Sequence, residues 1–288
     1  MYHVTQQAAK YKACPERISP GEESSSASAH PFPGLPDSLL DYAYNAVQKE
    51  EMVIAGSATA CVITLDSSKG VLRSANLGDS GFLILRQGTA SSDGASKDSA
   101  RAQKEPASHV KTSRSAPRPQ EGVLYASTAL QYGFNTPFQL AKLPPSMFQE
   151  GSITNTPKDA ALWECNLRDG DIVLLGTDGL FDNVHTTEVV QLMRFIKEKH
   201  HAAWNASKKG DGASFAVNGG KHRPDDPLAE ERSFIQLFCY NLIEYTRMCQ
   251  FSQTKRSPFE AEAERYGITY PGGKVDDVAV VCSLVVER

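Results

Sequence analysis

The chain has 288 residues, 40% of them hydrophobic, and a formal net charge of −4 at pH 7. This length allows one large domain or two small ones, and the hydrophobic share can supply a core. A weakly acidic net charge does not favour binding to nucleic acid or to an anionic membrane surface. No apolar run approaches the roughly 20 residues of a membrane span.

The first residues resemble a helix already under way, because Val4, Ala8 and Tyr11 fall on one helical face. They contain neither the apolar core of a signal peptide nor the arginines of a transit peptide. We therefore expect further sequence upstream in the working protein. Residues 15–36 are rich in Ser, Pro, Gly and Glu and are expected to be a disordered insertion. Asp37 is then predicted to cap a helix through Val47.

Strand patterns dominate the next part of the chain. They are predicted at 60–65, 71–77, 81–86, 123–126, 162–165 and 171–177, and the first two are joined by a hairpin loop. Residues 89–120 interrupt them and contain almost no large apolar residue, so we expect a second disordered insertion there.

Helical patterns follow the strands. One helix is predicted from Thr186 to Lys199, ending in a solvated His200-His201 pair, and residues 203–227 are expected to form a third disordered insertion. A longer helix should carry Ile235, Phe238, Leu242, Tyr245 and Cys249 on one face, and a shorter one should begin at Ser257-Pro258. A closing strand is predicted over 278–286. Adjacent strands, then helices, then a closing strand indicate an α+β layered domain.

Two acidic turns border predicted strands. Thr177 to Asn183 follows the apolar strand 172–175, and Gly272 to Asp277 leads into the strand that begins at Val278. Carboxylates at a sheet edge can hold a hard cation. Asp-Gly is also a common turn signal, so each stretch taken alone is equally consistent with a plain turn.

Four blocks, in this order, resemble the metal-dependent serine/threonine protein phosphatases of the 2C type. They are Gly56-Ser57-Ala58-Thr59-Ala60, then Ala75 to Gly81 (ANLGDSG), Thr177 to Asn183 (TDGLFDN), and Gly272 to Val278 (GGKVDDV). Residues 134–140 and 257–263 are similar to segments of the branch that has mitochondrial members.

The resemblance implies a single phosphatase domain over 1–288 with an αββα fold: two antiparallel sheets flanked by helices, here lacking the first strands. It implies Asp178 and Asp276 as ligands of Mg²⁺ or Mn²⁺, with two or more ions in the complete enzyme, and Asp79 as a ligand of an additional, weaker ion. Gly179 would let the backbone turn beside Asp178. Two such ions activate water and neutralise phosphoryl oxygens, and hard cations choose oxygen ligands.

Other interpretations of these residues stay open. Asp79 could merely close a turn. Asp182 is expected to cap the following helix rather than bind metal, and Asp277 is expected to support the ligands through hydrogen bonds. The resemblance further implies phosphorylated protein substrates, a monomer, and a mitochondrial location, or else a cytoplasmic one.

The family pattern also contains elements that this sequence lacks. It opens with two strands carrying acidic ligands and a basic phosphate-binding residue, followed by an Asp-Gly turn whose aspartate bridges both metals. Without that bridge, two dications about 4 Å apart repel by roughly 4 kcal/mol even in water. The sequence is therefore compatible with a phosphatase whose upstream part is absent here, or with a non-catalytic relative that binds phosphoproteins. We expect the 288-residue chain alone to be weakly active or inactive.

Overall fold

The computed structural model describes residues 35–86, 122–208 and 226–287, which belong to one compact unit running from Gly34 to Arg288. The predicted N-terminal helix, the predicted insertion 89–120 and most of the other two predicted insertions lie outside these residues. Within them, no helix is long and apolar enough to cross a membrane.

The first sheet is antiparallel and has the order β2-β3-β9, formed by β2 (Ala60–Asp66), β3 (Val71–Leu77) and β9 (Ala161–Asn166). The β2–β3 hairpin lies where the sequence predicts it. Gly70 closes it with a φ of 62°, a left-handed conformation that glycine adopts without steric cost.

The second sheet is also antiparallel and has the order β11-β10-β4-β5. Its strands are β4 (Gly81–Leu85), β5 (Val123–Ala126), β10 (Ile172–Gly176) and β11 (Val280–Leu284). The last strand is shorter than predicted, because Ala279 instead exchanges hydrogen bonds with Thr177 at the sheet edge.

The two sheets pack face to face. Phe82 and Ile84 of the second sheet share one buried cluster with Leu72 and Trp163 of the first, and the rings of Tyr125 and Trp163 stack at 3.8 Å. Burying aromatic rings of this size contributes strongly to the stability of a core.

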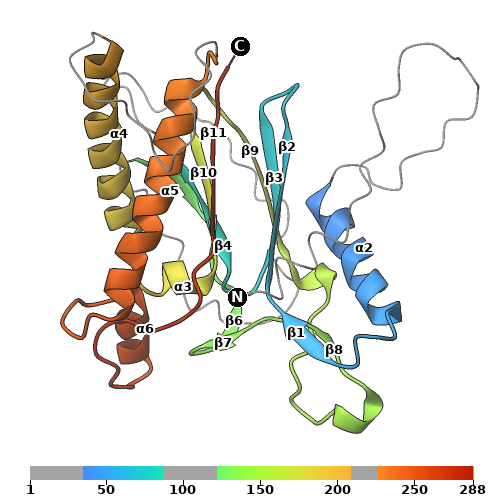
Figure 1. Ribbon diagram of the computed structural model, residues 1–288. Helices are drawn as coiled ribbons and strands as arrows, with labels where there is room; N and C mark the ends of the chain where they lie inside the picture. The colour runs from blue at the N-terminus through green and yellow to red at the C-terminus, as the bar shows by residue number, and fades with distance from the viewer. Residues whose placement is uncertain (1–34, 87–121, 209–225, 288) are drawn as a thin grey trace, which may run out of the picture. The chain divides into compact units, whose positions relative to one another are not determined.

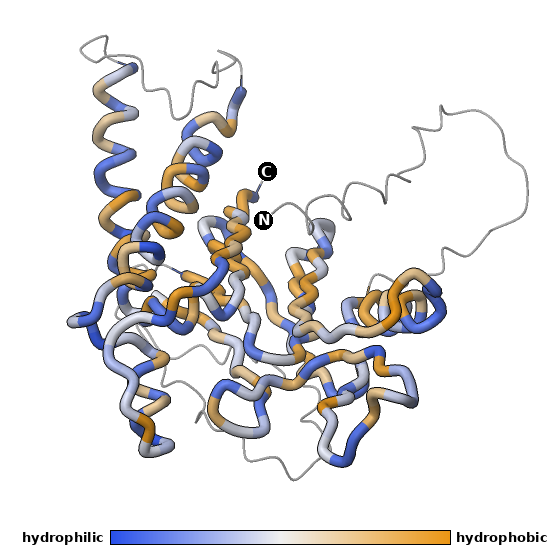
Figure 2. The backbone as a smooth tube through the Cα atoms, turned by 60° about the horizontal axis from the view of Figure 1, so that its bottom comes forward, coloured by the Kyte–Doolittle hydropathy of each residue, from blue (hydrophilic) through white to orange (hydrophobic). Residues whose placement is uncertain are grey.

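Helices cover the outer face of each sheet (Figure 1). The long helices α4 (Thr186–Lys208) and α5 (Ala229–Gln250) enclose a core with β4 and β10, whereas α2 (Pro36–Lys49) packs on β3 through Leu40. Both long helices alternate hydrophilic and hydrophobic residues along their length, as expected for helices with one buried face (Figure 2). The order helix, sheet, sheet, helix confirms the predicted αββα arrangement.

Short elements complete the fold and were not predicted, except for α6. They are β1 (Gly56–Ala58) paired with β8 (Leu140–Lys142), β6 (Gln131–Gly133) paired with β7 (Thr136–Pro137), the 3-10 turns η1 (Pro145–Met147) and η2 (Pro157–Asp159), and the helices α3 (Asp178–Phe181) and α6 (Pro258–Arg265). As predicted, α6 begins at Ser257-Pro258; Ser257 also caps the helix, because its Oγ accepts a hydrogen bond from the Glu260 N–H.

Three local predictions were wrong. Asp37 does not cap α2, because the helix already begins at Pro36, whose missing N–H needs no partner there, and Asp37 lies in its first turn. Residues 203–208 are not part of a disordered insertion, because α4 continues to Lys208. His200 is not solvated: it is buried between α4 and α5, and its Nε2 lies 3.0 Å from Ser233 Oγ.

Candidate functional site

The two acidic turns meet at one end of the second sheet. Strand β10 ends at Gly176, which pairs with Val280 at the start of the antiparallel neighbour β11. The residues just after β10 and just before β11 therefore lie next to each other. Short helix α3 then presents Asp178 from its first turn, and the segment ahead of β11 presents Lys274 and Asp276.

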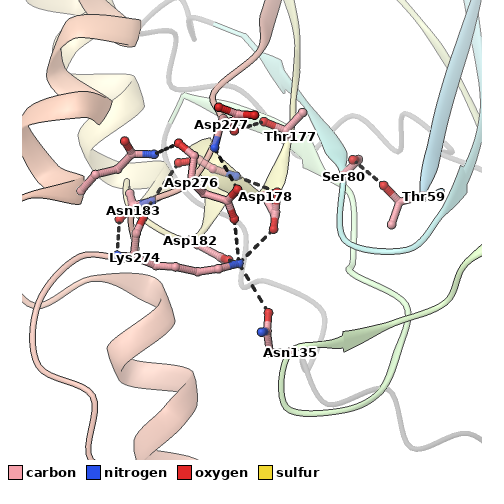
Figure 3. Close-up of polar contacts among 12 residues, drawn as sticks. Thr59, Ser80, Asn135, Thr177, Asp178, Asp182, Asn183, Lys274, Asp276 and Asp277 are labelled. Carbon is pink, nitrogen blue, oxygen red and sulfur yellow. Dashed lines mark hydrogen bonds and ion pairs between the residues drawn. The ribbon is translucent and has the colours of Figure 1, made fainter. Parts of the chain in front are cut away.

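Lys274 Nζ lies at the centre of three carboxylates (Figure 3). Its distances are 3.0 Å to Asp178 Oδ2, 2.9 Å to Asp182 Oδ2 and 3.1 Å to Asp276 Oδ2. Because all three oxygens lie within 3.1 Å of one nitrogen, any two of them are at most about 6 Å apart. We call these three aspartates the carboxylate cluster.

The charges of the cluster and of Lys274 stabilise each other. Burial lowers the pKa of Lys274, but the charges and hydrogen bonds of Asp182 and Asp178 outweigh it, so that the pKa is raised. Burial likewise raises the pKa of Asp276, but the hydrogen bonds from Lys274 and from the Asp277 N–H outweigh it, so that the pKa is lowered. Lys274 and Asp276 are therefore both charged at neutral pH.

Asn183 fixes the main chain of Lys274. Its side chain is fully buried; its Oδ1 accepts from the Lys274 N–H and its Nδ2 donates to the Lys274 carbonyl, both at 2.9 Å. The same Nδ2 donates to the Gly179 carbonyl in α3. One buried amide thus ties the third sequence block to the fourth.

Further hydrogen bonds hold the segment before β11. Gln250 Nε2 of α5 donates to the Asp276 carbonyl at 2.7 Å, and Thr177 Oγ1 donates to the Asp277 carbonyl at 3.2 Å. Asp277 thus supports the site through its main chain: its carbonyl accepts from Thr177, and its N–H donates to Asp276 Oδ1.

Gly179 has a different role from the one predicted. It lies in α3 with an ordinary helical backbone rather than in a tight turn, and its N–H donates to Asp178 Oδ1. A Cβ at this position would lie 2.2 Å from the Asp277 carbonyl oxygen. Glycine is therefore needed for the close approach of two main-chain segments.

The prediction that Asp182 caps the following helix was also wrong. It does not cap α4; at the N-terminus of that helix the Glu188 carboxylate accepts from the His185 N–H. Asp182 instead ends α3, and its side chain joins the carboxylate cluster. Residues three to four positions apart on a helical turn lie on one side, which explains why Asp178 and Asp182 converge.

Asp79 lies in the turn between β3 and β4. Gly78, with a φ of 98°, shapes this turn against Thr59, whose Oγ1 lies 2.9 Å from Ser80 Oγ. Asp79 lines a cavity of about 130 Å³ together with Phe181 of α3. The contacts of Lys274 that define the carboxylate cluster do not include Asp79.

The donor atoms of the carboxylate cluster suit a hard divalent ion, since all are carboxylate oxygens. Lys274 supplies one positive charge among three negative ones, so a net charge of −2 remains to attract a cation. Within the described residues, no group of three or more His, Cys, Asp or Glu side chains has the arrangement of a ready-made metal site. The cluster therefore fits such an ion chemically, while its oxygens face an ammonium group.

The roles of Lys274 and Asn183 were not predicted from the sequence. Both residues stand inside the quoted blocks, but a lysine among aspartates gives no signal of its geometry. The two segments similar to the mitochondrial branch also meet here: the rings of Phe134 and Phe259 are 4.9 Å apart, and Asn135 Oδ1 lies 3.4 Å from Lys274 Nζ.

Several curated proteins similar to this chain are named protein phosphatases. The chain is 28% identical over 258 residues to a "Protein phosphatase PTC7 homolog" of Xenopus laevis, and 29% identical over 252 residues to "Protein phosphatase PTC7 homolog fig" of Drosophila mojavensis. These alignments cover 88% and 87% of this chain but only 64% and 60% of the relatives. The chain therefore spans about three fifths of their length.

Among solved structures, the photosystem II phosphatase PBCP is similar, with a TM-score of 0.52 and 21% identity over 87% of this chain and 70% of that one. No protein-family model matches the chain. The PBCP likeness establishes the fold, and the alignments with PTC7 homologues cover most of the sequence. Over most of its length the chain is thus similar to the PTC7 protein phosphatases, and its fold is that of the phosphatase PBCP.

Proposed function

We propose that this protein hydrolyses phosphoserine and phosphothreonine in protein substrates, with the help of Mg²⁺ or Mn²⁺ held by the carboxylate cluster. The observation that carries the proposal is the convergence of Asp178, Asp182 and Asp276 on one cation, at the sheet edge formed by two of the family's sequence blocks.

The proposal assigns a role to each residue of the site. Asp178 and Asp276 would hold divalent ions, with Asp182 beside them and Asp79 serving a further, weaker ion. Asn183, Gln250 and Thr177 keep the ligand segments in place through main-chain hydrogen bonds, which avoids reorganisation when an ion binds. Bound ions of this kind lower the pKa of water and neutralise phosphoryl oxygens.

One observation favours a second function, namely recognition of phosphoproteins without hydrolysis. The Oδ2 atoms of the carboxylate cluster are engaged by the Lys274 ammonium. A protein of this kind would keep the fold and a phosphate-recognition surface but would release no phosphate.

Phosphate release from phosphoserine and phosphothreonine peptides separates the two functions. The 288-residue chain is compared with a version extended by the acidic strands and Asp-Gly turn of the family pattern, each with Mn²⁺, with Mg²⁺ and with a chelator. We expect metal-dependent release from the extended protein and weak or no release from the shorter one. Equal activity of the two would refute the need for the extra segment, and an inactive extended protein would favour the binding function.

The location and assembly state belong to the same proposal. Residues 134–140 and 257–263 support a mitochondrial location for this single-domain protein, and a monomer is expected. Immunolocalisation tests the first expectation, and sedimentation of the purified protein tests the second.

A further inference from the structure

Lys274 makes its three shortest polar contacts inside the carboxylate cluster. An ammonium group has three N–H donors, and each of the three aspartates accepts within 3.1 Å. The side chain is only 15% exposed, which is low for a lysine next to a sheet edge. This side chain therefore acts as a resident cation of the cluster.

A divalent ion and the Lys274 ammonium compete for the same oxygen atoms. Mg²⁺ binds carboxylate oxygens at about 2.0–2.1 Å and requires their lone pairs. The same lone pairs of Asp178 Oδ2 and Asp276 Oδ2 now accept from Lys274 Nζ at about 3 Å. Two positive charges that share one set of ligands also repel each other. Full occupancy by both is therefore unfavourable.

Two further groups beside the cluster already contact the ammonium group. Asn135 Oδ1 lies 3.4 Å from Nζ, and the centre of the Phe259 ring lies 5.1 Å from it. An amide oxygen can accept a hydrogen bond, and the face of an aromatic ring attracts a cation. Lys274 can thus leave the carboxylates without losing every favourable contact.

We propose that Lys274 is an exchangeable internal counter-ion, which holds the carboxylate cluster together without metal and is displaced when a divalent ion enters. The inference rests on the proposed function in so far as it takes the carboxylate cluster as the metal site. Displacing the Lys274 side chain would cost free energy and so weaken metal binding. In the absence of metal, the same side chain would keep the three carboxylates close together.

Chemical labelling of the unmodified protein tests the displacement directly. The rate at which an amine-reactive reagent modifies Lys274 is measured by mass spectrometry with a chelator and with Mg²⁺, while calorimetry on the same samples reports Mg²⁺ binding. We expect Lys274 to react several-fold faster when Mg²⁺ is bound. Lys69, whose Nζ pairs with Asp66 at 3.5 Å in the β2–β3 hairpin, is the internal control and should not change. An unchanged or slower rate at Lys274 in the Mg²⁺-bound protein would overturn the proposal.

A substitution series gives the thermodynamic test. Lys274→Met removes the ammonium, and we expect the affinity for Mn²⁺ to rise by about tenfold or more, because a neighbouring positive charge already lowers the proton affinity of a carboxylate by about one to three pKa units and opposes a metal ion in the same sense. Lys274→Arg retains the charge and should stay near the unmodified protein. Lys69→Met, at an exposed lysine that pairs with Asp66 in the β2–β3 hairpin, should leave the affinity unchanged.

The outcomes separate this inference from the proposed function. If the unmodified protein binds Mn²⁺ and Lys274→Met binds it no more tightly, the exchange is refuted while metal-dependent hydrolysis stands. If Lys274→Met binds Mn²⁺ more tightly but no phosphate is released by any form, the exchange holds and the hydrolytic function fails.

Discussion

Asn183 shows how a single residue can determine the geometry of the site. Its buried amide makes three hydrogen bonds at 2.9 Å, to both main-chain groups of Lys274 and to the carbonyl of Gly179. No hydrophobic pattern reveals such a role, because the sequence shows only a polar residue after an acidic turn.

Replacing this amide should destabilise the protein. We expect Asn183→Ala to lower the free energy of unfolding by about 1–3 kcal/mol for each buried main-chain group left without a partner. Urea denaturation measures the loss. Asn45→Ala is the control, because the Asn45 side chain is exposed on α2 and bonds only within that helix. If Asn183→Ala lost no more stability than Asn45→Ala, the hydrogen bonds of the Asn183 side chain would be unimportant for stability.

At the scale of elements, Glu188 connects the start of α4 to its neighbours. Its carboxylate accepts from the His185 N–H at 2.8 Å, from Tyr245 Oη of α5 at 2.6 Å and from Lys255 Nζ at 2.9 Å. Burial raises the pKa of Glu188, but these hydrogen bonds outweigh it and the pKa is lowered.

This lowered pKa predicts a pH dependence of stability. A carboxyl group whose pKa is lower in the folded state stabilises the fold above its unfolded pKa of about 4.3, and this contribution is lost as the pH falls through the folded pKa. The difference in unfolding free energy between the unmodified protein and Glu188→Gln should therefore shrink as the pH is lowered from about 6 to about 3. Denaturation at several pH values measures it, with the exposed Glu51→Gln as control. A difference that stays constant would contradict the role of Glu188.

Element types were predictable from the sequence where periodicity is strong. Strands β2 to β5 alternate or run apolar between turn residues, and they occur where expected. Helix ends were less predictable: α4 continues past His200 because Ser233 of α5 satisfies that imidazole, which is a tertiary contact. The turn after β10 became helix α3 for the same kind of reason, since Asn183 and Asp277 pack around Gly179.

At the scale of the whole molecule, the layered fold followed from the order of the elements and from the resemblance of the four blocks. In the interior between the sheets, burial raises the pKa of the Cys61 and Cys165 thiols to about 12, so both stay protonated at neutral pH. The assignment of ions to Asp178, Asp276 and Asp79 stays a prediction, because the ligand set depends on side-chain positions that periodicity does not encode.

The central claim is that the carboxylate cluster supports metal-dependent phosphate release, and charge-neutralising substitutions test it most directly. In the extended, active form, Asp178→Asn and Asp276→Asn should each remove most of the Mn²⁺-dependent release from phosphoserine peptides, because each deletes a charged ligand. Asp66→Asn, in the β2–β3 hairpin where Asp66 pairs with Lys69, should leave activity nearly unchanged. Full Mn²⁺-dependent activity in either cluster variant would contradict the account.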